Sequence, residues 1–216
     1  MNDNLMPDQR LVWDKKHAEG DHDKLLYSPS PLAILAEPYF RTDSKILELG
    51  CGVGRDAIFF QERGHSVLAT DSSSVVIKKN MARIHKENVV FEVLDMQEPL
   101  SYADESFDVV FANLSLHYYL DKKTREIAKE ITRVIKPGGV LAFACKSHDE
   151  FRTNEATKLE DNVFVAPNGH ALHIFSEDYA KDLLGTDFEI KHLDELDEEY
   201  LGRISGIVRC IARKLV

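Results

Sequence analysis

The sequence lacks the features that mark secreted and membrane proteins. Its three cysteines, Cys51, Cys145 and Cys210, stand far apart with no CxxC pair, which suits a reducing compartment better than a disulfide framework. No apolar run approaches the roughly 20 residues that cross a bilayer. The first ten residues also lack the charged-then-apolar pattern of a signal peptide. We therefore expect a cytoplasmic protein with no membrane partner.

The sequence also lacks an excess of positive charge. It has 27 basic and 37 acidic residues and a net charge of −10, with no dense basic patch. Nucleic-acid affinity depends largely on cations that neutralise phosphates, so no nucleic-acid partner is expected. The apolar content is 44% and the length is 216 residues, which favour one globular domain.

What the sequence does contain is a glycine-rich turn. Residues 46–54 read ILELGCGVG, with Gly50, Gly52 and Gly54 at every second position. The turn lies between a segment that fits a buried strand and a helical segment over residues 55–63. Glycine adopts positive φ and lets a ligand approach the backbone, and a helix N-terminus presents free N–H groups. The turn predicts a nucleotide site, and an ordinary tight connection is the alternative.

The glycine spacing differs from the dinucleotide-binding fingerprint. That fingerprint is GxGxxG, and its sixth position is occupied here by Arg55. A nicotinamide-dependent oxidoreductase is therefore disfavoured as an alternative. Glu48 lies two residues before the first glycine in an otherwise apolar strand, where an unpaired carboxylate would be costly. Glu48 is thus expected to reach polar partners.

Strand-like and helix-like patterns alternate along the middle of the chain. This alternation predicts an α/β fold with a doubly wound, mainly parallel, Rossmann-like sheet that has helices on both faces. The expected strands are residues 45–49, 65–70, 89–94, 107–112 and 140–145.

The flanks divide the expected single domain, residues 1–216, into further parts. Residues 194–200 are acidic and are interpreted as a solvated loop between two strands, residues 187–191 and 202–213. The expected parts are an N-terminal helical extension (1–44), a cofactor-binding core (45–145), an irregular insertion or lid (146–175), and a last helix with a C-terminal hairpin (176–216).

Polar residues follow several expected strands at their carboxyl ends, where doubly wound sheets bind ligands. Asp71 lies 17 residues beyond Gly54, a spacing at which an acid accepts hydrogen bonds from ribose hydroxyls. Asp95 fits an adenine amino group, with Met96 against the ring face. Each acid taken alone also fits a helix cap or a loop.

These segments resemble the class I S-adenosylmethionine-dependent methyltransferases. ILELGCGVGR, VLATD, FEVLDM, FDVVFANLSLHYY and VIKPGGVLAF follow one another in the family's order across residues 45–145. The resemblance implies a seven-stranded sheet with an antiparallel last strand, and S-adenosylmethionine as cofactor. The residues it assigns to the cofactor are Glu48, Gly50, Cys51, Gly52, Gly54, Arg55, Asp71, Ser72, Asp95, Met96, Asn113 and Leu114.

The flanking segments are similar to a small-molecule branch of this family. The segments that resemble the tellurite-resistance and thiopurine methyltransferases are Trp13 with residues 27–31, GRDA at residues 54–57, and the closing HIFSEDYAKDLL and CIARK. Base-modifying relatives carry Pro-Pro-aromatic after the Asn, whereas Asn113 is followed here by Leu and Ser. A small-molecule acceptor is therefore expected, contacted by Trp13, Tyr27, His117 and Tyr118.

His117 is also the candidate general base, because histidine titrates near neutral pH; the alternative is a histidine without chemistry. No metal site is expected, since the pairs His17 with His22 and His170 with His173 lack a third ligand and are interpreted as surface histidines.

The predicted activity is methyl transfer to a small molecule by in-line displacement, for which position matters most. A non-catalytic S-adenosylmethionine-binding protein remains the main alternative. The expected oligomeric state is a monomer or a homodimer.

Overall fold

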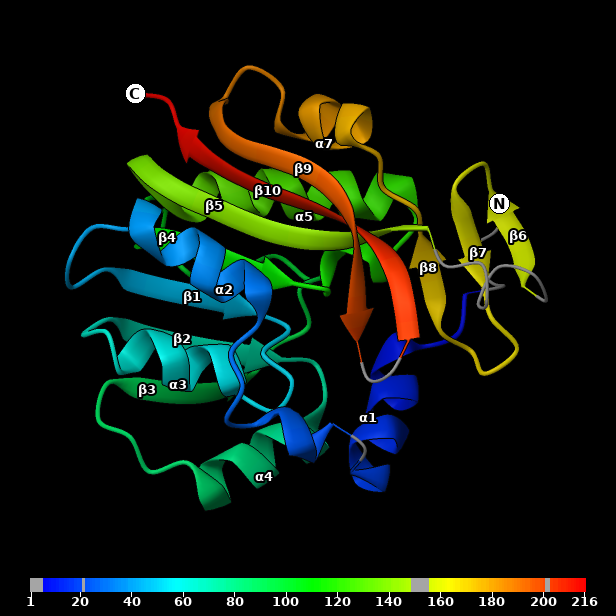
Figure 1. Ribbon diagram of the computed structural model, residues 1–216, viewed down its shortest axis with the longest axis horizontal. Helices are drawn as coiled ribbons and strands as arrows, with labels where there is room; N and C mark the ends of the chain where they lie inside the picture. The colour runs from blue at the N-terminus through cyan, green and yellow to red at the C-terminus, as the bar shows by residue number, and fades with distance from the viewer. Residues whose placement is uncertain (1–5, 21, 149–155, 201–202) are drawn as a thin grey trace.

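The computed structural model describes residues 6–20, 22–148, 156–200 and 203–216, which form a large and a small sheet with helices around them (Figure 1). The helices are α1 (Gln9–Glu19), α2 (Pro31–Ala36), α3 (Arg55–Gln61), α4 (Ser74–Arg83), α5 (Asp121–Val134) and α7 (Glu177–Leu184), with short 3-10 helices η2 (Asp23–Leu25), η3 (Glu37–Tyr39) and η4 (Leu116–Tyr118). The strands are β1 (Lys45–Leu49), β2 (Ser66–Asp71), β3 (Val89–Val93), β4 (Phe107–Asn113), β5 (Ile135–His148), β6 (Thr157–Glu160), β7 (Val163–Val165), β8 (Ala171–His173), β9 (Phe188–Tyr200) and β10 (Arg203–Lys214).

The large sheet has seven strands in the order β3-β2-β1-β4-β5-β10-β9. Its strands run parallel from β3 to β5, and β10 is antiparallel to both of its neighbours. The prediction of a doubly wound, mainly parallel seven-stranded sheet with an antiparallel strand is confirmed. The helices α1 and α2 precede β1, as expected of an N-terminal helical extension.

Helices cover both faces of this sheet, with α2 and α3 in front and α5 and α7 behind in Figure 1. Leu32, Phe60 and Ile77 belong to the buried cluster on the first face. Ile131 and Leu184 belong to the cluster on the second face. Burying each such side chain contributes about 1.5–3 kcal/mol, so the two clusters hold the strand ends in fixed positions. Within the described residues, no helix is both long and apolar enough to cross a bilayer.

The Pro-Gly-Gly segment, residues 137–139, lies inside β5, which begins at Ile135 and not at residue 140, the expected start of this strand. Ile135 already pairs with Phe107, and the register shifts before Val109 meets Val140. Gly139 makes the turn possible, because a Cβ there would lie 2.8 Å from the Asp108 carbonyl oxygen. The strand is therefore interrupted by a tight irregularity at residues 137–139.

The segment expected to be irregular, residues 146–175, contains regular structure. β5 continues through His148, and β6, β7 and β8 form a three-stranded antiparallel sheet. Residues 149–155 lie outside the described residues. The strands of the small sheet are four, three and three residues long, too short to show a period of two in the sequence. The small sheet lies beyond the carboxyl end of β5 (Figure 1).

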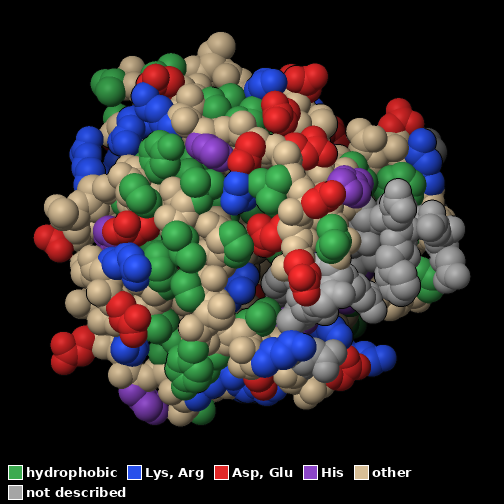
Figure 2. Space-filling view, in the orientation of Figure 1, with side chains coloured by type: hydrophobic (Ala, Val, Ile, Leu, Met, Phe, Trp, Pro, Cys, Tyr) green, Lys and Arg blue, Asp and Glu red, His purple; other side chains and the backbone are tan. Residues whose placement is uncertain are grey.

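The acidic run is part of a strand and not a loop. β9 continues through it in antiparallel pairing with β10. Asp194 is held by Arg209 on β10, with nitrogen–oxygen distances of 2.6 and 3.0 Å, which offsets the negative charge. Figure 2 shows acidic side chains gathered along the lower half of this hairpin.

Candidate functional site

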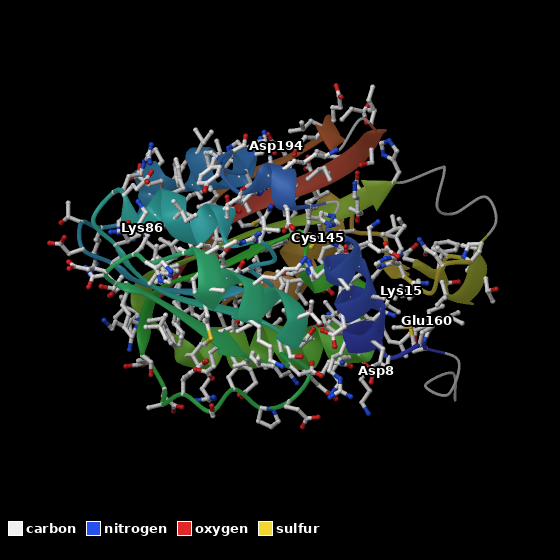
Figure 3. All side chains as sticks on the ribbon, turned by 90° about the horizontal axis from the view of Figure 1, so that it is seen from below. Asp8, Lys15, Lys86, Cys145, Glu160 and Asp194 are labelled. Carbon is white, nitrogen blue, oxygen red and sulfur yellow. The ribbon has the colours of Figure 1, made fainter. Side chains whose placement is uncertain are left out.

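A cavity lies at the carboxyl ends of β1, β2, β4 and β5. It is closed on one side by α1, which packs beside α4 (Figures 1 and 3). The described residues that line it are Gln9, Trp13, His17, His22, Leu25, Glu48, Gly50, Cys51, Gly52, Val53, Arg55, Asp56, Asp71, Ser72, Met96, Asn113, Leu114, Ser115, Tyr118, Tyr119 and Lys146.

The three glycines of the turn have different roles. All have positive φ, at +77° for Gly50, +50° for Gly52 and +81° for Gly54. A Cβ at Gly50 would overlap the side chain of Ser115, and one at Gly54 would lie 2.9 Å from Ile84 Cδ1. At Gly52 the nearest such atom is His17 Cε1 at 4.0 Å. Gly50 and Gly54 thus allow close packing, whereas Gly52 leaves open space beside its Cα at the cavity.

Asp71, at the end of β2, is anchored by the glycine turn. Its Oδ2 accepts the Gly52 N–H at 2.9 Å, and its Oδ1 accepts the Ser73 N–H at 2.8 Å. Burial raises the pKa of Asp71 to about 6, although the two backbone N–H groups oppose that change. Each carboxylate oxygen keeps a lone pair for a ligand, so Asp71 can accept from two further donors.

Glu48 is buried beneath the turn, with 3% of its surface exposed. Its Oε2 has no hydrogen-bond partner among the described residues. Burial raises the pKa of Glu48 well above its usual range, and the nearby Asp56 carboxyl adds to this rise. A buried oxygen without a donor is costly, so this position suits a ligand that supplies one.

The loop after β4 holds a strained residue. Leu114 has a φ of +53°, a conformation that costs a side chain with a Cβ about 1–3 kcal/mol. Its N–H donates to the Ala144 carbonyl oxygen at 2.9 Å, and Ser115 Oγ donates to the Leu49 carbonyl oxygen at 2.7 Å. These bonds tie the loop to β5 and β1 at the cavity wall.

Aromatic rings form the wall that α1 contributes. Trp13 lies 5.4 Å from His17, 5.9 Å from His22 and 5.2 Å from Tyr118 between ring centroids. Burial, with His22 adding to it, lowers the pKa of His17 to about 4, so His17 is neutral at physiological pH.

The expectation of surface histidines at positions 17, 170 and 173 is wrong. These side chains are buried, with exposed fractions of 5%, 6% and 2%. α1 packs beside α4, β8 packs on η4, and the Trp13 ring lies 4.9 Å from that of His170, and the sequence contains no direct signal of these distant contacts. No group of three metal-ligating side chains occurs in the part of the chain that the structure describes.

Polar contacts dock α1 on α4. Asp14 Oδ1 accepts from Ser73 Oγ at 2.6 Å and from the Val75 N–H at 3.3 Å. Lys79 Nζ donates to the His17 carbonyl oxygen at 2.6 Å. Because Ser73 also follows Asp71 closely, the docking of α1 and the shape of the cavity are coupled.

Most of the residues predicted for the cofactor line this one cavity. The exceptions are Gly54, which packs behind the turn, and Asp95, whose Oδ1 accepts the Gln97 N–H at 3.0 Å. On the acceptor side, Trp13 and Tyr118 line the cavity. Tyr27 is 87% exposed and does not line it, so the geometry gives no support for its predicted contact with the acceptor.

His117 is fully buried and lies behind Tyr118, with ring centroids 4.3 Å apart. It is not among the residues that line the cavity. A general base must come within hydrogen-bond reach of the proton it removes. The role of His117 therefore stays a prediction, and its position favours support of the Tyr118 ring.

Several lining residues were missed by the sequence reasoning. Gln9, Trp13 and His17 are spaced by four on α1, a helical stripe that could have predicted the other two from Trp13. Lys146 lies near the carboxyl end of β5. Doubly wound sheets bind ligands at the carboxyl ends of their strands, so the argument that identified Asp71 could also have identified Lys146. Asp56 and Tyr119 carry no comparable signal.

The strand order, the glycine turn and the acid after β2 define a Rossmann-like protein with a nucleotide-type ligand site at its strand ends. A family model described as a methyltransferase domain matches residues 46–139. A SAM-dependent methyltransferase from Methanosarcina mazei superposes with a TM-score of 0.74 at 27% identity, covering 84% of this chain and 97% of that one.

Sequence relatives agree with this match. Phosphoethanolamine N-methyltransferase 1 of Arabidopsis thaliana is 32% identical over 188 residues, which are 84% of this chain and 36% of the relative. Malonyl-[acyl-carrier protein] O-methyltransferase of Salmonella typhimurium is 33% identical over 103 residues, 48% of this chain and 39% of the relative. This chain spans about a third of the length of the phosphoethanolamine N-methyltransferases that it matches. The chain belongs to the class I S-adenosylmethionine-dependent methyltransferases.

Proposed function

We propose that this protein is an enzyme that transfers a methyl group from S-adenosylmethionine to a small-molecule acceptor. The observation that carries the proposal is one cavity that is lined both by Gly52, Asp71 and Glu48 and by Trp13 and Tyr118. Such a mixed lining, with backbone and carboxyl groups beside aromatic rings, suits a cofactor and an acceptor that meet in one cavity.

The residues present fit this cofactor. Glu48 Oε2 has no hydrogen-bond donor among the described residues, and there is open space beside the Cα of Gly52. Asp71 can accept further hydrogen bonds from the two hydroxyls of a vicinal diol. We propose that Asp71 with Ser72 binds the ribose and that Met96 packs on the adenine. Asn113 and Leu114 would border the sulfonium. Asp95 would act at the adenine end through the loop that it shapes.

S-adenosylmethionine, when bound, supplies a methyl group on an already activated sulfur. The task left to the chain is to hold the acceptor in line and to exclude water. Tyr118 and Tyr119 are buried at 8% and 7% exposure, and α1 covers the opening. His117, which packs on the Tyr118 ring, would hold that ring in place as a positioning residue.

The acceptor class follows from the relatives and the charge. The relatives are named for phosphoethanolamine and for a malonyl group on a carrier protein. We propose a small-molecule acceptor, no nucleic-acid partner because of the net charge of −10, a cytoplasmic location, and a monomer or homodimer.

Methyl transfer from labelled S-adenosylmethionine to a panel of small acceptors tests the proposal. The panel includes phosphoethanolamine, ethanolamine and simple carboxylic acids. We expect labelled product from at least one of them. Binding of S-adenosylmethionine without product from any acceptor in a broad library would favour the non-catalytic alternative.

Cofactor affinity should depend on pH through Asp71. Its carboxylate form accepts hydrogen bonds from the ribose, and its pKa in the ligand-free protein is about 6. As the pH falls below 6 the group is protonated and affinity is lost, by about tenfold at pH 5 relative to pH 8. Titrations of S-adenosylhomocysteine at several pH values check this. A profile that is equally steep in Asp71→Asn would contradict the assignment.

Asp14→Ala should loosen α1. The substitution leaves Ser73 Oγ and the Val75 N–H without their acceptor on α1, at a cost of about 1–2 kcal/mol. We expect S-adenosylhomocysteine to bind about tenfold more weakly, measured by calorimetry. Glu19→Ala on the same helix, whose partner Lys16 is 3.6 Å away at the surface, is the matched control. Equal affinities of the two variants would exclude a role for α1 docking.

A further inference from the structure

Lys146 brings a positive charge to the cavity from β5. Its side chain is 5% exposed, and it lines the cavity. Its Nζ donates to the hydroxyl of Ser205 on β10, which is itself 4% exposed. Burial of a lysine is costly, so this position calls for a compensating interaction.

The end of the β9–β10 hairpin shapes the surroundings of Lys146. The register of β10 against β5 shifts between Gly206 and Ile207, and Lys146 pairs with Ile207. A Cβ at Gly206 would overlap the side chains of Ser147 and His148. Glycine at this position lets the two strands approach closely beside Ser205.

The hairpin also contributes a negative charge. Glu198 on β9 is half-buried, and burial raises its pKa while Arg209, Arg55 and Lys146 oppose that rise. Glu198 is thus within electrostatic range of both cavity cations.

The basic side chains of the cavity come from different elements of the fold. Among the described lining residues, Arg55 and Lys146 are the arginine and lysine side chains. Arg55 directly follows the glycine turn, and its Nε lies 4.0 Å from Asp56 Oδ2. Lys146 is on β5, which is separated from β1 by β4. Lys146 therefore lies on the side of Asn113 and Leu114 away from the glycine turn.

We propose that Lys146 binds an acidic group of the methyl acceptor, a carboxylate or a phosphate, and that Ser205 is its positioning residue. The inference rests on the proposed function, because it takes the glycine end of the cavity as the cofactor's. A buried ammonium attracts an anion more strongly than an exposed one, and Ser205 accepts from Nζ while its own hydroxyl proton can face the anion.

The test uses protein saturated with S-adenosylhomocysteine, so that the glycine end is filled. Inorganic phosphate, acetate and methylammonium are titrated as separate probes by calorimetry. We expect an anion to bind, and Lys146→Gln to weaken that binding at least tenfold. Lys146→Arg should retain affinity within about threefold, because it keeps the charge. Phosphate against acetate distinguishes the two acidic groups.

Two milder variants keep the test valid if Lys146→Gln fails to fold. Ser205→Ala should weaken anion binding about threefold by releasing Nζ. Glu198→Gln should strengthen it, because a like charge is removed. Lys122→Gln, at a side chain that is 90% exposed on α5, is the matched control and should change nothing.

The outcomes separate the two claims. Failure of the wild type to bind S-adenosylhomocysteine would overturn the proposed function and this inference with it. Cofactor binding with equal anion affinity in wild type and Lys146→Gln would overturn this inference alone. The same holds if methylammonium binds and neither anion does. A cofactor affinity that changes less than twofold in Lys146→Gln shows that the effect is on the acceptor side.

Discussion

Asp71→Asn is expected to weaken binding of S-adenosylhomocysteine about 100-fold. The carboxylate accepts from the Gly52 and Ser73 N–H groups and, in our proposal, from the ribose hydroxyls. An amide has a single acceptor oxygen, so one backbone N–H would face an NH₂ group and the charge would be lost. Hydrogen bonds to charged groups contribute about 1.5–3 kcal/mol each, and about 2.8 kcal/mol corresponds to the stated factor.

The measurement is a calorimetric titration at pH 8, where wild-type Asp71 is ionised given its pKa of about 6. Asp161→Asn, at a fully exposed side chain outside the cavity, is the control and should bind as the wild type does. Thermal unfolding of both variants confirms that they are folded. An affinity within threefold of the wild type would remove Asp71 from the cofactor site.

Gly50→Ala should lower the free energy of unfolding by several kcal/mol. The residue has a φ of +77°, and a Cβ there would overlap the side chain of Ser115. The left-handed conformation costs a residue with a Cβ about 1–2 kcal/mol, and forced overpacking adds about 1–3 kcal/mol. At about 2–4 °C per kcal/mol, the melting temperature should fall by roughly 10 °C.

Two further variants separate strain from overlap. In Gly50→Ala combined with Ser115→Gly the overlap is gone, so we expect part of the stability to return. Gly64→Ala is the matched control, because its φ is +88° but the nearest atom to an added Cβ, Asp43 Oδ1, is 3.7 Å away. It should lose only about 1 kcal/mol and leave cofactor affinity unchanged. Equal losses in Gly50→Ala and Gly64→Ala would show that Ser115 does not restrict the turn.

The placements that the sequence predicted are local ones. The glycine turn and Asp71 border one cavity, as a few adjacent residues and the position of a strand end indicate, and their roles toward a ligand stay predictions. The burial of Ile46 and Leu47 in β1 follows from the same short apolar segment. These local patterns also predict which residues lie together, because a parallel sheet brings the carboxyl ends of its strands to one edge.

The features that it missed depend on packing between distant segments. His17 is buried because α1 lies on α4, 60 residues later in the chain, as the bond from Lys79 to the His17 carbonyl shows. Lys146 borders the cavity beside Ser205, and this neighbour is brought there by the pairing of β10 with β5. The acidic run pairs as a strand because Arg209 faces Asp194. The spacing of residues within one segment cannot predict these contacts between distant segments.

A parallel titration of the wild-type protein with S-adenosylhomocysteine and with NAD tests most directly whether the glycine turn binds S-adenosylmethionine. We expect S-adenosylhomocysteine to bind at one site per chain, with an affinity that Asp71→Asn lowers about 100-fold, and we expect no binding of NAD there. Binding of NAD with no binding of S-adenosylhomocysteine would contradict the assignment of the glycine turn to the binding site of the methyl donor.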